Sequence, residues 1–243
     1  RKILNNLTRF QGRFRGQAGR EYHLCAQNIV GLEAERNVLH AIHGVPLNNI
    51  SVVPLGLPQQ FLSVQKGDRN GDYLVSHGTI TERKNSVELA KLARDSKVPI
   101  LFIGKPYHLD DPYWKRFERL IDNRWVRHQN HVPDTAALID ILRTARGFIL
   151  MSAGENWCLA AHEAAACGLP LLLPRMNWSL ERFGDQAQYL EAPGSTSNNE
   201  ILQRFYHQST TLPSPQIRQW SWKEAAQQLL PVYEHAISSI RSK

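Results

Sequence analysis

The chain has 243 residues, of which 42% are hydrophobic, and a formal net charge of +7. This composition is typical of a globular protein, and no apolar run approaches the roughly 18 residues of a membrane-spanning helix. The three cysteines form no CxxC pair and are odd in number, which argues against a disulfide framework and a structural zinc site.

Part of the basic charge is concentrated at the start of the chain, in Arg1, Lys2, Arg9, Arg13, Arg15 and Arg20. Nucleic acid and anionic membranes attract such charge, but no basic stripe interleaved with aromatic residues is present. We therefore expect no nucleic-acid partner and favour a solvated surface that faces an anionic substrate or a further domain. The chain begins without methionine, and we expect it to be a piece of a longer protein.

The first 55 residues predict the end of an α/β domain, because they are too few for a whole one. We expect a strand over residues 23–30, a helix over residues 33–43 and a short strand over residues 51–53. Proline and glycine then indicate an extended linker over residues 54–58.

From residue 72 onward, apolar runs alternate with helical patterns. The runs predict strands over residues 72–77, 99–103, 125–129, 147–151 and 169–173. The helical patterns lie over residues 84–96, 111–121, 135–145 and 158–167. Residues 193–199 are expected to form a loop and residues 222–240 a long amphipathic helix. This alternation predicts an α/β fold with a Rossmann-like parallel sheet and helices on both faces.

Two aspartates stand at predicted helix starts, Asp111 before a proline and Asp134 before residue 135. Short carboxylate side chains accept hydrogen bonds from the first N–H groups of a helix, so both are predicted N-caps. A metal site at residues 110–111 is the less favoured alternative. Histidine pairs at positions 40/43 and 128/131 lack a third nearby ligand, so no metal site is predicted.

The junction after residue 151 carries the strongest functional signal. A short polar turn joins an apolar strand to an Ala-rich helix, and Glu155 and Glu163 lie on either side of the helix start. A helix N-terminus at the carboxyl edge of a parallel sheet receives phosphate through free N–H groups and the helix dipole. Carboxylates repel phosphate and suit hydroxyl groups, so the combination is typical of a nucleotide-sugar site.

The same residues resemble a known family. Glu155 and Glu163 are separated by seven residues and followed by Ala-Ala-Ala-Cys-Gly-Leu-Pro, similar to the E-x7-E motif of retaining glycosyltransferases of family 4. Further landmarks between residues 24 and 235 agree in order and spacing, at positions 52–56, 77–85, 102–104, 131–145 and 220–222.

The resemblance implies a GT-B fold, in which two Rossmann-like domains face a cleft and the C-terminal domain holds the donor. Residues 1–55 would then be the remnant of the N-terminal acceptor domain and the linker. Residues 56–221 would form the nucleotide-sugar-binding domain, and residues 222–243 a helix that crosses back.

The resemblance also implies residue roles. Glu163 would accept hydrogen bonds from ribose hydroxyls, and Glu155 would face the transferred sugar. Lys84 would offset the charge of the leaving diphosphate, so Lys84 and Glu155 are the predicted catalytic residues. The remaining donor contacts would come from the loop at Gly78 and Thr79, from the base-bordering pair Val132 and Pro133, and from the N–H groups of Asn156, Trp157, Cys158 and Leu159.

Two positions depart from the family pattern. Thr79 stands where the family usually has a second basic residue, and Arg83 is a candidate to replace it. Cys158 stands where a small residue is common. Of the cysteines, Cys25 and Cys167 are expected to be buried and inert.

The resemblance implies hexosyl transfer with retention from a nucleoside diphosphate sugar, UDP-glucose first and GDP-mannose second, to a glycan or lipid-linked acceptor of exopolysaccharide type. No cofactor or metal is expected. The location would be cytoplasmic, with possible peripheral contact to the inner face of the membrane. Two alternatives stay open: a donor-binding module without turnover, and a phosphorylase-like or epimerase-like enzyme of the same fold.

Overall fold

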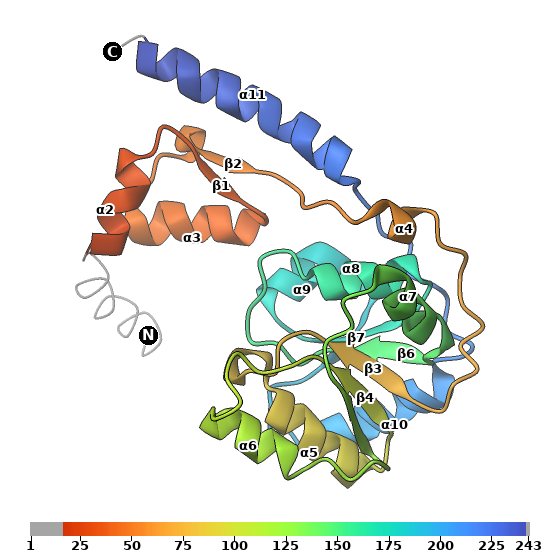
Figure 1. Ribbon diagram of the computed structural model, residues 1–243. Coiled ribbons are helices and arrows are strands. Elements are labelled where there is room, and N and C mark those ends of the chain that lie inside the picture. The colour runs from red at the N-terminus through yellow and green to blue at the C-terminus, as the bar shows by residue number, and fades with distance from the viewer. Residues whose placement is uncertain (1–16, 242–243) are drawn as a thin grey trace. The chain divides into compact units, whose positions relative to one another are not determined.

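The computed structural model describes residues 17–241. These residues form two compact units (Figure 1). The larger unit spans Leu57–Ser221, and the smaller combines the described chain up to Gly56 with the chain from Trp222. The basic residues from Arg1 to Arg15 lie outside the described part. That the smaller unit is the remnant of an acceptor domain stays a prediction.

The smaller unit contains two parallel strands, β1 (Asn28–Val30) and β2 (Ile50–Val52), which pair residue 28 with residue 50. Its helices are α2 (Gln17–Leu24), α3 (Glu33–His43), the 3-10 turn η1 (Leu47–Asn49) and α11 (Trp222–Arg241).

The strand expected over residues 23–30 is wrong in its first half, where the chain is helical up to Leu24. The β-branched residues that favour strands begin only at Ile29. Cys25, expected to be buried, is exposed, whereas Cys158 and Cys167 are buried.

The larger unit is built on a six-stranded, fully parallel sheet in the order β5-β4-β3-β6-β7-β8. Its strands are β3 (Leu74–His77), β4 (Ile100–Ile103), β5 (Val126–Gln129), β6 (Gly147–Ile149), β7 (Leu171–Pro174) and β8 (Gln188–Leu190). The predicted Rossmann-like parallel sheet is confirmed.

Helices cover both faces of this sheet, as predicted. Figure 1 shows α7 (Thr135–Thr144), α8 (Leu159–Ala166) and α9 (Asn177–Phe183) on one side. On the other side lie α5 (Ser86–Ser96), α6 (Pro112–Glu118) and α10 (Ser197–Gln208), while α4 (Gln59–Leu62) contacts α7 and α8. The strands β3, β6 and β7 are almost entirely buried, which explains why β6 and β7 are apolar throughout, whereas β3 ends in the polar residues Ser76 and His77.

Both predicted aspartate caps are confirmed. Asp111 accepts a hydrogen bond from the Tyr113 N–H at 2.8 Å, and Asp134 accepts from the N–H groups of Ala136 and Ala137. These caps fix the starts of α6 and α7, which border the loops after β4 and β5.

The loop expected over residues 193–199 is wrong beyond residue 196, because α10 begins at Ser197. The buried side chain of Asn198 accepts a hydrogen bond from the Glu191 N–H at 2.8 Å and donates to the carbonyl groups of Glu191 and Ala192. These bonds to the loop directly before the helix hold an Asn-rich segment in a helix against its low intrinsic propensity. The sequence also did not predict α4, α9 and β8.

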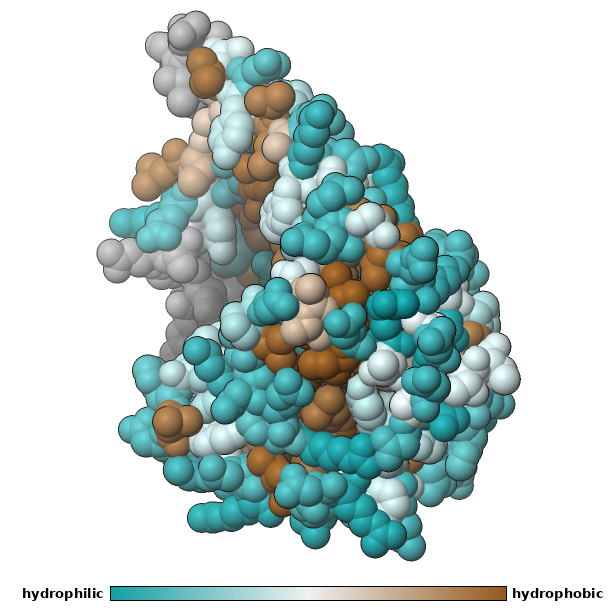
Figure 2. All heavy atoms as spheres, turned by 45° about the vertical axis from the view of Figure 1, so that its right-hand side comes forward, coloured by the Kyte–Doolittle hydropathy of each residue, from teal (hydrophilic) through white to brown (hydrophobic). Residues whose placement is uncertain are grey.

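Hydrophilic side chains cover most of the face shown in Figure 2, and hydrophobic ones show through in narrow strips. The exposed large hydrophobic residues are concentrated in the smaller unit, at Leu24, Ile29, Val38, Leu47, Leu55, Trp222, Leu230, Tyr233 and Ile237. The larger unit therefore buries its apolar residues more completely.

The strand order reverses between β3 and β6, so the loops after these strands diverge at the carboxyl edge of the sheet. Open α/β sheets bind ligands at such a switch point. The backbones of Gly78 and Gly104 meet there, both with positive φ, at 137° and 152°. A Cβ atom on Gly104 would lie 1.9 Å from the Gly78 carbonyl oxygen.

We predict that Gly104→Ala lowers the free energy of unfolding by about 1–3 kcal/mol, because the added methyl group forces two loop backbones apart. Urea denaturation followed by tryptophan fluorescence measures the change. The matched control is Gly154→Ala, since no atom lies within 4 Å of the added carbon at that position. Equal stability of the two variants would contradict the prediction.

Candidate functional site

An open cavity of about 460 Å³ lies at the carboxyl edge of the sheet. Its volume falls in the range of small-molecule sites, about 300–1,000 Å³. The loops after β3, β4 and β5 line it together with α7 and α8, through His77, Gly78, Thr79, Ile103, Gly104, Lys105, His131, Val132, Leu138 and Glu163.

A larger hollow of about 630 Å³ lies at the opposite end of the sheet, between the end of α5 and the turn before β5. Its lining includes Arg94, Asp122 and Trp125. It faces the amino ends of the strands, away from the switch point and from all predicted site residues. The carboxyl-edge cavity is therefore the better candidate site.

Backbone hydrogen bonds join the loops that line the cavity. The Gly78 N–H donates to the Ile103 carbonyl at 2.9 Å, and the Ile80 N–H donates to the Lys105 carbonyl at 3.1 Å. The Gly104 N–H donates to the carbonyl of Gln129, the last residue of β5, also at 2.9 Å. The floor of the cavity is thus backbone, which a ligand can approach closely where glycine provides no side chain.

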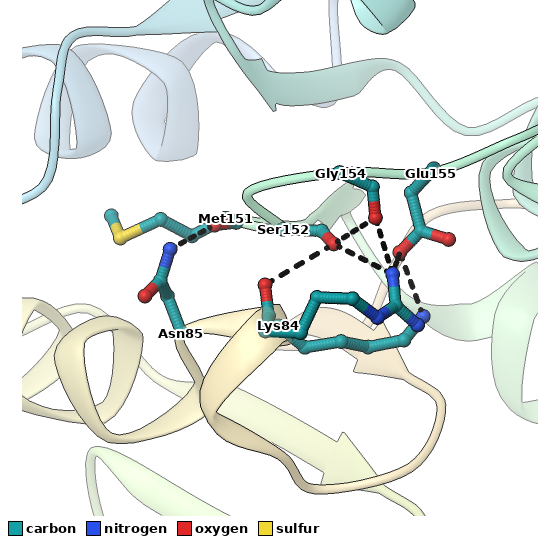
Figure 3. A network of polar contacts seen from close by, with 7 residues as sticks. Lys84, Asn85, Met151, Ser152, Gly154 and Glu155 are labelled. Carbon is teal, nitrogen blue, oxygen red and sulfur yellow. Dashed lines mark hydrogen bonds and ion pairs between the residues drawn. The ribbon is translucent and has the colours of Figure 1, made fainter. Parts of the chain in front are cut away.

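Beside the cavity, two cations converge on Glu155. Its Oε1 atom lies 3.1 Å from Lys84 Nζ and 3.2 Å from Arg83 Nη1, as Figure 3 shows. Neither contact has hydrogen-bond geometry, so both are ion pairs. Lys84 and Glu155 are largely buried, with side-chain exposures of 14% and 11%, whereas Arg83 is exposed at 53%.

The residues that carry these charges are fixed to one another across two loops. The Asn85 side chain donates to the Met151 carbonyl at 2.9 Å, and the Ala153 N–H donates to the Arg83 carbonyl at 2.8 Å. Arg83 also donates to the Gly154 carbonyl. Arg83, the candidate replacement for the basic residue missing at Thr79, is therefore bound to the loop after β6 in this structure.

The N-terminus of α8 offers free N–H groups. Cys158 precedes the helix in the left-handed conformation, with φ 58°, and provides no side-chain cap. Within residues 17–241 the N–H groups of Asn156, Trp157, Cys158 and Leu159 have no acceptor. The positive φ explains why a residue of minimal size suits position 158.

The side chains of Cys158 and Trp157, two residues whose N–H groups are predicted to contact the donor, are turned into the protein. Burial, followed by the charge of Glu155, raises the pKa of the Cys158 thiol to about 12, so it is no nucleophile at neutral pH. The buried Trp157 ring stacks on His162 with centroids 5.3 Å apart, and the Arg182 guanidinium lies 3.3 Å from the Trp157 centroid. Only the backbone of these residues is available to a ligand.

Glu163 faces the cavity from the fifth position of α8. Burial raises the pKa of its carboxyl to about 7, against the opposing effect of the Lys84 charge. Its Oε2 atom lies 3.3 Å from Nε2 of His77, the last residue of β3. Burial, then the Lys84 charge, lowers the pKa of His77 to about 4, against the opposing effect of the Ala160 backbone, so this imidazole is uncharged at neutral pH.

The structure brings Gly78, Thr79, Val132 and Glu163 together on the cavity wall. Lys84 adjoins them, since its Nζ lies 3.0 Å from the position that a Cβ on Gly78 would take. Pro133 and the stretch 156–159 are not among the lining residues.

Sequence reasoning missed five lining residues besides His77: Ile103, Gly104, Lys105, His131 and Leu138. Their position in the sequence could have identified them, because most of them lie at or just after the ends of predicted strands. Within residues 17–241, no group of three His, Cys, Asp or Glu side chains is placed to hold a metal ion. None of the described helices is both long and apolar enough to cross a membrane.

Comparison with known proteins identifies relatives in sequence and in fold. The chain is 27% identical to the O-antigen chain mannosyltransferase B of Escherichia coli over 175 residues. These residues are 67% of this chain and 45% of that protein. Among solved structures it is similar to Anabaena HepE in complex with UDP and glucose, with a TM-score of 0.66 and 15% identity over 86% of this chain and 63% of HepE.

It is also similar to S. aureus TarM in complex with UDP, alpha-GlcNAc-glycerol and fondaparinux, with a TM-score of 0.63 and 14% identity over 89% of this chain and 43% of TarM. These structural neighbours are GT-B glycosyltransferases, and the likeness shows the fold. The chain spans less than two thirds of the length of each of the three relatives. Residues 60–212 match the family described as glycosyl transferases group 1, and the chain belongs to that family.

Proposed function

We propose that this chain binds the donor in a retaining glycosyltransferase of family 4 type, which transfers a hexosyl unit from a nucleoside diphosphate sugar to a glycan or lipid-linked acceptor. The observation that supports this most directly is the meeting of three features at the switch point: the free N–H groups before α8, the Lys84 ammonium group and the Glu163 carboxyl. They match the phosphate and hydroxyl groups of such a donor.

In the proposed complex, the nucleobase lies against Val132 and Leu138, and its ribose hydroxyls donate to Glu163. The diphosphate lies between the N-terminus of α8 and Lys84. The bond between the anomeric carbon and the diphosphate oxygen breaks, the acceptor oxygen bonds to that carbon on the same face, and the acceptor's proton is released. Lys84 and the N–H groups stabilise the charge that develops on the leaving diphosphate.

Glu155 has a double role in this proposal. It accepts hydrogen bonds from hydroxyls of the transferred sugar, and it holds Lys84 and Arg83 beside the diphosphate. Two cations and one carboxylate leave a single net positive charge in this cluster, enough to attract the donor without a metal ion. The proposal therefore includes no cofactor.

A UDP-hexose is the first proposed donor, because HepE and TarM were solved with UDP. GDP-mannose is the second, favoured by the similarity to the E. coli mannosyltransferase. The acceptor would bind to a domain outside this chain, so the chain alone would bind donor without turnover. A cytoplasmic location at the inner face of the membrane and a role in exopolysaccharide synthesis belong to the proposal.

We predict that calorimetric titration of this chain detects one nucleotide series, either UDP and UDP-glucose or GDP and GDP-mannose. Glu163→Ala should then weaken donor binding about 30-fold, because a charge-assisted hydrogen bond contributes about 2 kcal/mol. Glu118→Ala on α6 is the matched control, since Glu118 forms only an exposed ion pair with Lys115. Binding of neither series, or unchanged affinity in Glu163→Ala, would contradict the assignment.

Lys84→Met should weaken the binding of the nucleoside diphosphate by about 10-fold or more and leave the binding of the free nucleoside unchanged, because only the diphosphate carries the charge that Lys84 offsets. Parallel titrations with UDP and uridine, or GDP and guanosine, measure the difference. Lys115→Met controls for the loss of a lysine. An equal loss for nucleotide and nucleoside would assign Lys84 a structural role instead.

A further inference from the structure

His77 is the least explained polar residue of the cavity. Its Nε2 atom is buried and has no hydrogen-bond partner among the described residues. The side chain is 10% exposed, and its ring meets the Phe148 ring edge-on with centroids 5.7 Å apart. An unpaired buried nitrogen costs about 1–3 kcal/mol, so packing alone does not account for a histidine at this position.

Two groups of α8 face the ring: the carboxyl of Glu163, whose Oε2 lies 3.3 Å from Nε2, and the backbone of Ala160, whose hydrogen bond raises the pKa of the imidazole. Both elements are fixed: His77 pairs with Ile103 in the sheet, and Glu163 lies in the middle of α8. The contact lacks hydrogen-bond angles in this structure. Polar contacts in ligand-free sites are often long or misaligned and tighten when the substrate binds.

We propose that His77 is the positioning residue of Glu163: its Nε2–H donates to Oε2 of the carboxylate and leaves Oε1 to accept the hydroxyl groups of the donor's ribose. This inference rests on the proposed function, because it takes Glu163 as the ribose acceptor. In this arrangement Oε2 faces the protein and bonds to His77, and Oε1 faces the open cavity and bonds to the ribose.

Other charged and titratable groups surround the pair. Lys84 on the turn η2 (Glu82–Lys84) favours the charged carboxylate, while Lys105 and His131 line the same cavity from the loops after β4 and β5. Cys167, at the end of α8, lies close enough to Glu163 for its thiol pKa to rise, mainly by burial and then by the carboxylate charge. With a raised pKa of about 7, Glu163 is partly protonated at neutral pH.

Ribose hydroxyls need the ionised carboxylate as acceptor, so donor affinity should rise with pH through about 7. An N–H donor favours the ionised form, and removing it raises the pKa of the carboxyl. The loss of affinity on removing His77 is therefore largest at the acid end of the profile, at and below neutral pH. It shrinks at higher pH, where Glu163 is ionised with or without this donor.

The test is titration of the full chain with UDP-glucose and GDP-mannose between pH 6 and 9. These donors lack a terminal phosphate, whose second ionisation near pH 6 would obscure the profile. His77→Leu should bind about fivefold more weakly at pH 7 and about tenfold more weakly at pH 6, corresponding to an upward shift of the profile by about one pH unit. His77→Gln places an amide N–H close to the position of Nε2 and should restore both affinity and profile.

Two controls separate positioning from a structural role. In a Glu163→Gln background, His77→Leu should have no further effect on affinity, and neither variant should lose its cooperative unfolding transition. A loss that is equal at every pH and is not restored by His77→Gln would overturn the proposal, as would a wild-type profile in His77→Leu.

A measurement on the unmodified protein gives an independent test. Nitrogen NMR of the imidazole in the donor complex should show the tautomer protonated at Nε2. A tautomer protonated at Nδ1 in the complex would overturn the proposal. If the wild-type chain binds neither donor, the proposed function fails first, and this inference fails with it.

Discussion

The contact on which the site depends is the close approach of two glycine backbones at the carboxyl edge of the sheet. Gly104 lies against the Gly78 carbonyl, where no side chain fits. This contact lets the loops after β3 and β4 exchange backbone hydrogen bonds and leaves the cavity open on one side. The Lys84 ammonium group also lies against Gly78, since its Nζ is 3.0 Å from the position that a Cβ would take there. Both approaches require a glycine, because a side chain would fill the space.

Around this contact, burial controls the charges. Glu155 stays near two cations, whereas Glu163 faces an uncharged imidazole and has a pKa raised to about 7. Two glutamates that look alike in the sequence are thus chemically different groups. One suits a permanent role in holding cations, and the other has an acceptor strength that depends on pH near neutrality.

The sequence predicted the elements that line the site better than those at the margins. The strands β4, β6 and β7 are continuous apolar runs because both faces are covered, whereas β3 ends in the polar residues Ser76 and His77. It failed where side-chain bonds overrule backbone preference, as in α10, whose start depends on Asn198 bonding to the loop directly before the helix. It failed again in the smaller unit, where the chain before Leu24 is helical although a strand was expected from residue 23.

By itself, the sequence determined the fold class, the carboxyl edge as the candidate site, and the pairing of a helix start with Glu155 and Glu163, because periodicity and motif spacing are local properties. Only the tertiary structure decided which side chains face the cavity. Trp157 turns inward because His162 and Arg182 pack on it, and Arg83 is held by a carbonyl and Glu155. His77 is a candidate site residue because strand pairing and the position of α8 bring it next to Glu163. The two residues are far apart in the sequence, so no local pattern predicts that they meet.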